Sequence, residues 1–329
     1  MYYSFIIPVF NRPDEVGELL ESLTVQTYPY FEVIIVEDGS SVPCRDVVQR
    51  YGDRLNIRYY EKSNSGPGQT RNYGAERAKG DYLLILDSDV ILPPDYLSEV
   101  EKELQTLPAD AFGGPDRAHE SFTDLQKAIN YSMTSFFTTG GIRGGKNKLD
   151  KFYPRSFNMG VERTVYQKLG GFSNMRFGED LDFSIRIIKE GYTCRLFREA
   201  WVWHKRRTDF EKFFKQVFNS GIARINLYKK YPDSLKVVHL LPAIFTIGVV
   251  FFLFCALFYG IGLLPLFIYA FLVFIDSTNK NRSLHIGFLS SIAAYVQLLG
   301  YGCGFLYAWW KRCVLGKDEF TAFNRHFYK

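Results

Sequence analysis

The sequence is poor in cysteine and has no paired cysteines. Its five cysteines lie far apart, and no two of them show the close spacing of metal ligands. We therefore expect a reducing compartment and no structural disulfide. The first residues also lack the basic stretch and the apolar core of a signal peptide, since Pro8 interrupts the short apolar run. These absences favour a protein whose soluble part stays in the cytoplasm.

Charge is absent from two long stretches near the C-terminus, residues 240–275 and 286–310. Because a membrane span needs about 20 apolar residues, the first stretch can hold two helices and the second one. We predict spans at about 240–259, 261–276 and 286–310. Gly300, Gly302 and Gly304 also allow a bent or re-entrant third segment, so its topology stays open. The expected location is the cytoplasmic (inner) membrane, multi-pass, with the soluble domain facing the cytoplasm.

Positive charge gathers just before the first uncharged stretch. Residues 205–236 hold nine Lys/Arg against three Asp/Glu, whereas the whole chain has a net charge of +5. Attraction to anionic headgroups explains this position better than nucleic-acid binding. Apolar residues recur there at helical spacing from Phe210 to Tyr228, which indicates an amphipathic helix in the membrane interface. The alternative is an ordinary helix packed on the soluble domain.

The first 90 residues alternate between strand and helix patterns. Strands are expected at 3–9, 31–36, 57–60 and 82–86, with helices at about 14–26, 44–51 and 69–78 between them. This alternation predicts an α/β fold with a mostly parallel sheet covered by helices on both faces. A further helix is expected after Pro94 up to Leu107, and the glycine-rich basic segment 140–148 is expected to be a mobile loop or a phosphate-facing lid.

Polar residues follow the predicted strands where parallel strands reach the same edge of a sheet. They form four clusters, at 8–12, 37–40, 66–72 and 87–89. In open α/β folds this edge binds the ligand. Asp87 and Asp89, one residue apart, can hold a hard divalent cation, which can in turn hold a diphosphate.

These clusters resemble those of the family 2 glycosyltransferases, which are inverting enzymes with the GT-A fold. The resemblance covers residues 2–205 and is carried by Pro8-Val9-Phe10-Asn11-Arg12, Gln26 to Ser40, Gly66, Arg71 to Ala75, Gly80, Asp87-Ser88-Asp89, Asn158-Met159-Gly160, Gly170-Gly171-Phe172 and Gly178 to Asp182. It implies a GT-A catalytic domain at 1–205. A basic juxtamembrane segment at 206–238 and a membrane region with a short basic tail at 239–329 are expected to follow.

The resemblance also implies residue roles. Asp89 would bind Mg²⁺ or Mn²⁺, with Asp87 as a second ligand and His204 as a further candidate whose alternative is a structural hydrogen bond. Asp180 would be the base that activates the acceptor hydroxyl, with Glu179 as the alternative and helix capping as a competing role. Glu37 departs from the Asp that the family often has there. The residues expected around the donor are Pro8, Val9, Asn11, Arg12, Glu37, Asp38, Gly66, Arg71, Asp87 and Ser88.

The implied function is that of a membrane-anchored, metal-dependent, inverting hexosyltransferase. It would take a UDP- or GDP-sugar and a lipid-linked or growing-glycan acceptor in surface polysaccharide or glycolipid synthesis, with no nucleic-acid partner. An inactive sugar-nucleotide-binding scaffold and a nucleotidyltransferase are the alternatives. The glycine-rich loop that nucleotidyltransferases place after strand one is absent, as is the Gln-x-x-Arg-Trp signature of processive synthases. The sequence does not indicate the sugar, the acceptor or the oligomeric state.

Overall fold

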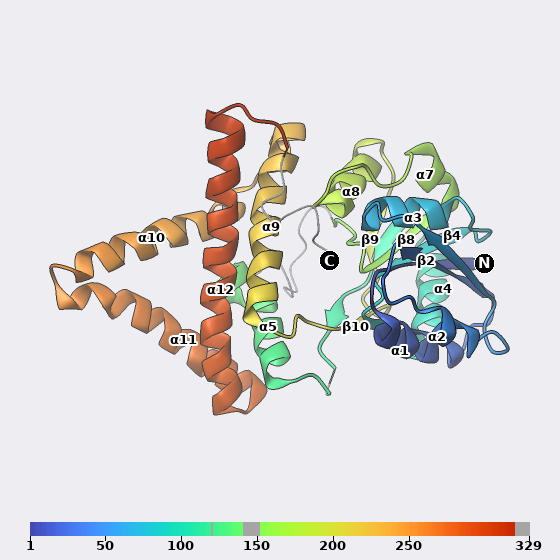
Figure 1. Cartoon of the computed structure of the whole chain (residues 1–329), viewed down its shortest axis with the longest axis horizontal. Helices are drawn as coiled ribbons and strands as arrows, with labels where there is room; N and C mark the ends of the chain where they lie inside the picture. Colours follow the sequence, from blue (N-terminus) through green and yellow to red (C-terminus); the bar gives the residue numbers. More distant parts are fainter. Residues whose placement is uncertain (120, 141–151, 320–329) are drawn as a thin grey trace. The chain divides into compact units, whose positions relative to one another are not determined.

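The computed structural model describes residues 1–119, 121–140 and 152–319, which form two compact units (Figure 1). Unit 1 contains the described residues of Met1–His119 and Asp150–Lys205, and unit 2 contains those of Glu120–Leu149 and Arg206–Lys329. The predicted glycine-rich loop falls almost entirely outside the described residues.

Unit 1 is built on a seven-stranded sheet in the order β3-β2-β1-β4-β8-β6-β9. Four neighbouring pairs are parallel, whereas β8 runs antiparallel to both β4 and β6. A second sheet of three short strands has the order β5-β10-β7. The strands are β1 (Tyr3–Val9), β2 (Phe31–Asp38), β3 (Ile57–Lys62), β4 (Tyr82–Leu86), β5 (Val90–Ile91), β6 (Ala111–Gly113), β7 (Asp116–Arg117), β8 (Asn158–Glu162), β9 (Cys194–Leu196) and β10 (Val202–His204).

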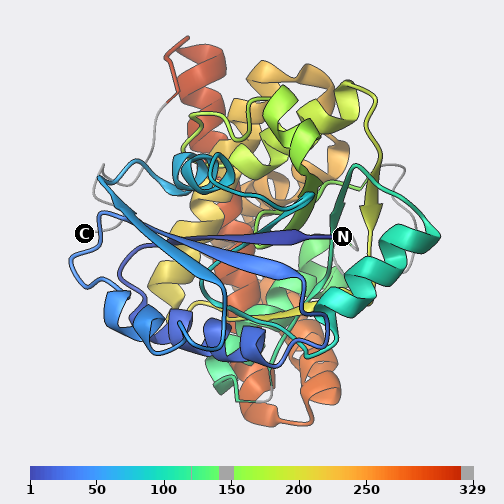
Figure 2. The same cartoon turned by 90° about the vertical axis from the view of Figure 1, so that its right-hand side faces the viewer.

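Helices cover both faces of the large sheet because its central strands are apolar on both sides. In β1, Phe5 and Ile7 pack on one face, while Ile6 packs on the other. Figure 2 shows the sheet between these two layers. The first layer has α1 (Pro13–Thr24), α2 (Arg45–Gln49) and α4 (Tyr96–Thr106), and the second has α3 (Pro67–Ala75), α7 (Arg163–Lys168) and α8 (Glu179–Lys189). The predicted mixed α/β fold is confirmed, and its helix ends differ from those predicted by one to three residues.

Unit 2 is helical. The structure gives it α5 (Asp124–Thr134), α6 (Phe136–Thr139), α9 (Phe210–Lys230), α10 (Leu241–Ala256), α11 (Leu264–Asn281) and α12 (Leu284–Trp309), with short helical turns η1 (Pro232–Ser234), η2 (Val237–His239), η3 (Gly260–Leu263) and η4 (Trp310–Val314). Two helical segments, Gly260–Asn281 and Leu284–Val314, are long and apolar enough to cross a membrane. Helix α10 is shorter than the predicted span of 240–259, because it begins at Leu241 and ends at Ala256.

Glycines let the backbones of α9 and α12 approach each other. A Cβ atom on Gly304 would lie 2.0 Å from the Phe218 carbonyl oxygen, and one on Gly221 would lie 2.2 Å from that of Tyr301. Helix α12 is continuous through Gly300, Gly302 and Gly304, which were expected to allow a bent or re-entrant segment. Their small size serves helix packing instead.

Candidate active site

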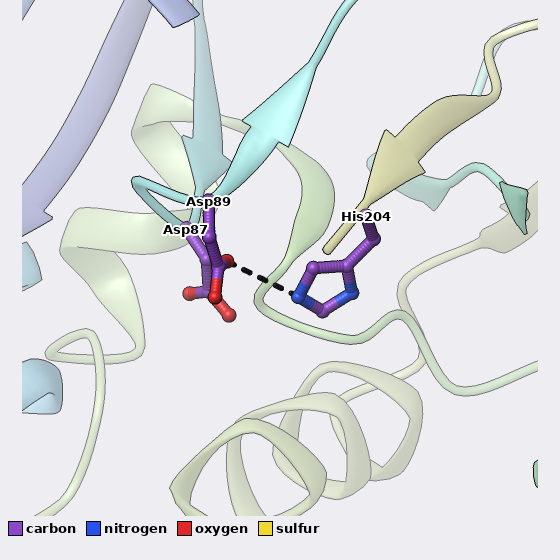
Figure 3. Close-up of side chains that lie close together, drawn as sticks. All are labelled: Asp87, Asp89 and His204. Atoms are coloured by element: carbon purple, nitrogen blue, oxygen red, sulfur yellow. Dashed lines mark ion pairs between the residues drawn. The ribbon is translucent and has the colours of Figure 1, made fainter. Parts of the chain in front are cut away.

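Asp87, Asp89 and His204 meet at the edge where β4 ends. The two aspartates follow β4, and His204 is the last residue of β10, which pairs with β5 directly after Asp89. One ligand atom from each of the three lies within 4.8 Å of the others (Figure 3). His204 Nε2 is 3.2 Å from Asp89 Oδ1, and the Phe157 ring stacks on the imidazole at 4.9 Å. The structure thus brings together the three residues predicted to bind metal.

This donor set suits a divalent cation. Carboxylate oxygens are the ligands that Mg²⁺ and Mn²⁺ prefer, and imidazole is a common ligand of transition-metal ions. Asp89 already has a cationic neighbour, because Arg12 Nη1 donates to its Oδ2 at 2.7 Å. Arg12 was predicted to contact the donor, and the structure places its guanidinium directly beside the metal candidate.

Arg71 joins this cluster to the start of α8. Its Nη2 donates to Asp87 Oδ1 at 2.7 Å, and its Nη1 donates to Glu179 Oε1 at 3.1 Å. The side chain is only 4% exposed. Burial alone would lower the pKa of Arg71, but Asp87 and Glu179 raise it, so the guanidinium stays charged. A buried cation therefore links the carboxylates predicted for the donor side and for the acceptor side.

Helix α8 begins with the two carboxylates predicted to act as a base. Its N-cap is Gly178, at φ +84°, so Glu179 and Asp180 are the first two helical residues and neither is the cap. Asp180 Oδ1 accepts from the Leu181 backbone N–H at 2.8 Å, and Arg155 Nε donates to Asp180 Oδ2 at 2.6 Å. Asp180 thus has a helix-stabilising contact and a cationic partner as well.

The neighbouring charges separate the pKa values of the two acids. Burial raises the pKa of Glu179 to about 7, and the nearby Asp180 carboxylate adds to this rise. Burial would also raise the pKa of Asp180, but the charge and hydrogen bond of Arg155 outweigh it and hold that pKa below its usual range. Asp180 is therefore ionised near neutral pH, whereas Glu179 titrates there.

The predicted nucleoside residues gather after β1 and β2. Asp38 accepts from Lys62 Nζ at 2.6 Å and from the Ser65 and Gly66 backbone N–H groups at 2.8 Å each, so most of its acceptor capacity is occupied within the protein. Glu37 accepts from the Cys44 N–H at 2.6 Å and from the Ser40 hydroxyl. These contacts fix the loop after β2 and leave a hollow of about 350 Å³ lined by Glu37, Gly39, Ser40, Pro43, Glu61 and Lys62.

Asn11 connects the first two strand-end loops. It adopts a left-handed backbone with φ 53°, a conformation that Asn tolerates better than most residues. Its N–H donates to Ser40 Oγ at 2.9 Å, and its side-chain oxygen accepts from the Val42 N–H at 2.9 Å.

Val9 was also expected around the donor, but its side chain is buried in the core beneath α1 and α4. A larger hollow of about 470 Å³ lies between α1 and α2, and none of the predicted metal or base residues lines it.

Three residues of the site were missed by sequence reasoning: Arg155, Lys62 and Phe157. Arg155 pairs with an acid 25 residues later, and Lys62 pairs with one 24 residues earlier. Neither has a local pattern that marks it. Lys62 could have been suspected because it lies two residues after a predicted strand, as Asp38 does after another predicted strand.

Known proteins resemble this chain in sequence. Residues 4–170 match the sequence profile of glycosyl transferase family 2. A glycosyltransferase of Haemophilus influenzae is 33% identical over 195 residues, covering 57% of this chain and 62% of that protein. The chain spans only 22% and 62% of the first two curated relatives it matches.

Two solved structures share the fold. The mannosyltransferase PcManGT from Pyrobaculum calidifontis, in complex with GDP-Man and Mn²⁺, aligns with a TM-score of 0.63 at 18% identity, over 90% of this chain and 86% of that one. S. aureus TarS 1–349 in complex with UDP-GlcNAc aligns with a TM-score of 0.50 at 19% identity, over 69% and 67%. The GT-A architecture of these neighbours matches the mixed sheet of unit 1.

Proposed function

The chain belongs to glycosyltransferase family 2, and from this membership we propose that it is a metal-dependent, inverting enzyme acting at a membrane. It transfers a hexose from a nucleoside diphosphate to a lipid-linked or growing-glycan acceptor in surface polysaccharide or glycolipid synthesis. The observation that carries the proposal is the meeting of Asp87, Asp89 and His204 within 4.8 Å. The GDP-Man and UDP-GlcNAc complexes of the two neighbouring structures support a nucleotide-sugar donor.

The donor is held at the strand ends. Asp89, Asp87 and His204 would hold Mg²⁺ or Mn²⁺, which when bound offsets the negative charge that develops on the leaving diphosphate. Arg12, 2.7 Å from Asp89, supplies a further positive charge at the same place. Asn11 and Glu37 shape the loops around the nucleoside, and Asp38 orders the Ser65–Gly66 backbone beside it.

The acceptor is activated from α8. Asp180 takes the proton of the acceptor hydroxyl as that oxygen attacks the anomeric carbon from the face opposite the diphosphate, which inverts the configuration. Arg155 keeps Asp180 ionised and fixes its carboxylate. Glu179 and Arg71 hold the α8 start in register with Asp87.

The site can be tested by nucleotide binding and turnover measured separately. Thermal stabilisation by UDP, GDP, CDP and dTDP is measured with and without Mn²⁺, followed by donor hydrolysis and transfer. We expect Asp89→Ala to lose both metal-dependent stabilisation and turnover. Asp180→Asn should keep the stabilisation and lose turnover by about 10²–10⁴-fold, the usual contribution of a general base.

The exposed Asp53→Ala variant is the matched control, and it should behave as wild type. Full transfer activity in Asp180→Asn would remove the base assignment. If no nucleotide stabilised the protein with any metal, the scaffold alternative would replace the enzyme.

A further inference from the structure

We propose that unit 2 binds one leaflet of a membrane without crossing it. In this arrangement the hairpin of α10 and α11 enters the leaflet and returns, while α9 and α12 lie along the surface. The inference rests on the membrane part of the proposed function and specifies how the chain meets the lipid. Figure 1 shows α10 and α11 converging on a tip that lies away from α9 and α12.

The end of the hairpin exposes many apolar side chains. Six of them are between 59% and 79% exposed: Val250, Phe254, Leu257, Phe258, Ile261 and Phe267. Val250 and Phe251 are exposed and consecutive in α10, so they point about 100° apart around the helix axis. A second copy of the chain would cover one face of the hairpin, whereas lipid can surround it. The occupant that fits is the acyl region of a bilayer.

The hairpin is too short for two full crossings. Helix α10 has 16 residues, about 24 Å at 1.5 Å per residue. Helix α11 passes the length test together with η3, but Asp276 interrupts it, and its uncharged part, residues 264–275, has 12 residues, about 18 Å. Asp276 accepts from Tyr131 of α5 at 2.6 Å, so it stays with the rest of unit 2. Since the hydrocarbon core is about 30 Å thick, neither uncharged arm spans it, and the tip turns back within it.

Helix α12 passes the length test for a span, but half of its most apolar window is buried by protein. Val217 lies against Gly300, Phe218 lies against Gly304, and Arg312 Nη1 donates to Asn226 Oδ1 at 2.9 Å. The contacting residues follow the same order along both helices, so α9 and α12 run side by side in the same direction. A crossing by α12 would therefore carry α9 with it.

Helix α9 cannot enter the hydrocarbon core. It carries Lys212 and Lys215 in its first two turns and Arg224, Lys229 and Lys230 in its last two. Burying these charged side chains in lipid is costly. The α9–α12 pair thus belongs at the polar surface, where basic side chains contact anionic headgroups.

Exposed cations lie at both ends of the hairpin, opposite its tip. Lys236 precedes α10, while Lys280 and Arg282 lie at the end of α11. Because both ends lie on the same side of the tip, one headgroup layer can contact all three basic side chains. This charge pattern fits entry and return through one membrane face.

Cysteine labelling tests the topology in the full chain. The protein is added to sealed vesicles of phosphatidylcholine and phosphatidylglycerol, then treated outside with a membrane-impermeant maleimide, and labelled peptides are identified by mass spectrometry. Native Cys313 and an introduced His285→Cys report on the two ends of α12, and Tyr259→Cys reports on the tip. We expect both α12 ends to be labelled from outside and the tip to be protected until detergent is added.

Two labelling results would overturn the inference. Protection of one α12 end from the outside reagent means that α12 crosses. Labelling of Tyr259→Cys only by reagent trapped inside the vesicles means that the hairpin crosses. In both cases membrane association itself, and the proposed activity, would stand.

Charged substitutions at the tip of the hairpin test whether lipid surrounds it. The double variant Phe258→Glu, Ile261→Glu should lower the vesicle-bound fraction at least about tenfold, because two carboxylates would enter the hydrocarbon. Val237→Glu is the matched control, since Val237 is 76% exposed but lies outside the uncharged run. On vesicles of phosphatidylcholine alone, where headgroup charge has no effect, the control should change binding less than about twofold.

The remaining outcomes separate this inference from the activity. If the double variant still binds vesicles but detergent-solubilised protein changes from dimer to monomer, the tip is an interface between copies and the inference is wrong. Wild type that hydrolyses donor but does not bind vesicles would remove the membrane part of the proposal along with the inference. Loss of nucleotide binding alone would affect only the proposed activity.

Discussion

The two units bury polar groups and backbone in opposite ways. In unit 1, buried charges are paired, and Arg71 lies between Asp87 and Glu179 with its side chain 4% exposed. In unit 2, tight contacts are made by glycine against backbone, as with Gly304 and the Phe218 carbonyl. A charge network fixes orientation, which a reaction centre needs. Close backbone packing keeps helices together without relying on water, which suits a unit that contacts lipid.

The strongest test of the contrast removes the central cation of unit 1. Arg71→Met removes the cation that pairs with the buried Glu179 and the half-buried Asp87, so we expect unit 1 to lose about 3–5 kcal/mol of stability. Chemical denaturation of the detergent-solubilised protein measures the change. Arg45→Met is the control, because Arg45 and Glu61 form an exposed pair that should contribute little. Equal stability of both variants would show that the Arg71 network is not structural.

The second test acts on unit 2 through its glycines. Gly304→Ala places a Cβ atom 2.0 Å from a carbonyl oxygen, so α9 and α12 must separate, at a cost of about 1–3 kcal/mol or more. Gly248→Ala is the matched control. Its Cβ atom meets nothing within 4 Å, and alanine favours a helix, so no loss is expected. Thermal unfolding of both variants, with nucleotide binding as a readout for unit 1, separates the effects. A loss of nucleotide binding in Gly304→Ala would show that the two units are coupled.

Much of unit 1 could be predicted because its signals are local. Each carboxylate cluster directly follows an apolar strand, and the carboxyl ends of parallel strands meet at one sheet edge. Asp87, Asp89 and Glu37 were therefore found from their positions alone. The antiparallel strand β8 and the ion pair of Arg155 with Asp180 were not, because both depend on contacts between distant segments. Neither hydrophobic periodicity nor a turn residue indicates such a contact.

Unit 2 was less predictable for a related reason. Apolar runs indicate burial or lipid, and the sequence does not distinguish the two. Helix α12 has the composition of a span, yet half of its most apolar window is buried by protein. In the sequence, Gly300, Gly302 and Gly304 allow a bend, and only the position of α9 shows that they are packing sites. The grouping of α5 with unit 2 likewise has no sequence signal.

The third test compares the two acids at the start of α8. If Asp180 is the base, transfer should persist well below pH 7, because Arg155 holds its pKa below the usual range and the carboxylate stays ionised. If Glu179 is the base, kcat/KM should fall about tenfold per pH unit below its pKa of about 7, as the carboxylate protonates. We expect the first result for kcat/KM measured from pH 5 to 9. An acid limb near 7 that disappears in Glu179→Gln would transfer the role to Glu179.

The smallest expected effect concerns the basic surface of unit 2. Lys229→Gln should weaken binding to anionic vesicles by about 1 kcal/mol, and the difference should shrink in high salt as the charge is screened. Co-sedimentation at two salt concentrations measures it. Lys102→Gln, an exposed lysine of α4 in unit 1, is the control. An equal loss in both variants would mean that the membrane does not contact unit 2 in particular.

The position of α5 in the chain has a consequence for synthesis. Its apolar side chains Ile129 and Met133 pack with Phe213, Val217 and Ala293 of α9 and α12. From Thr134 to Trp309 the ribosome must add 175 residues, which takes about 10–35 s at 5–20 residues per second. Until α12 has been made, the apolar face of α5 can be covered only by its partners on α9. A chain cut at residue 205 would lack both helices, so a fragment ending there is expected to need detergent or chaperones to stay in solution.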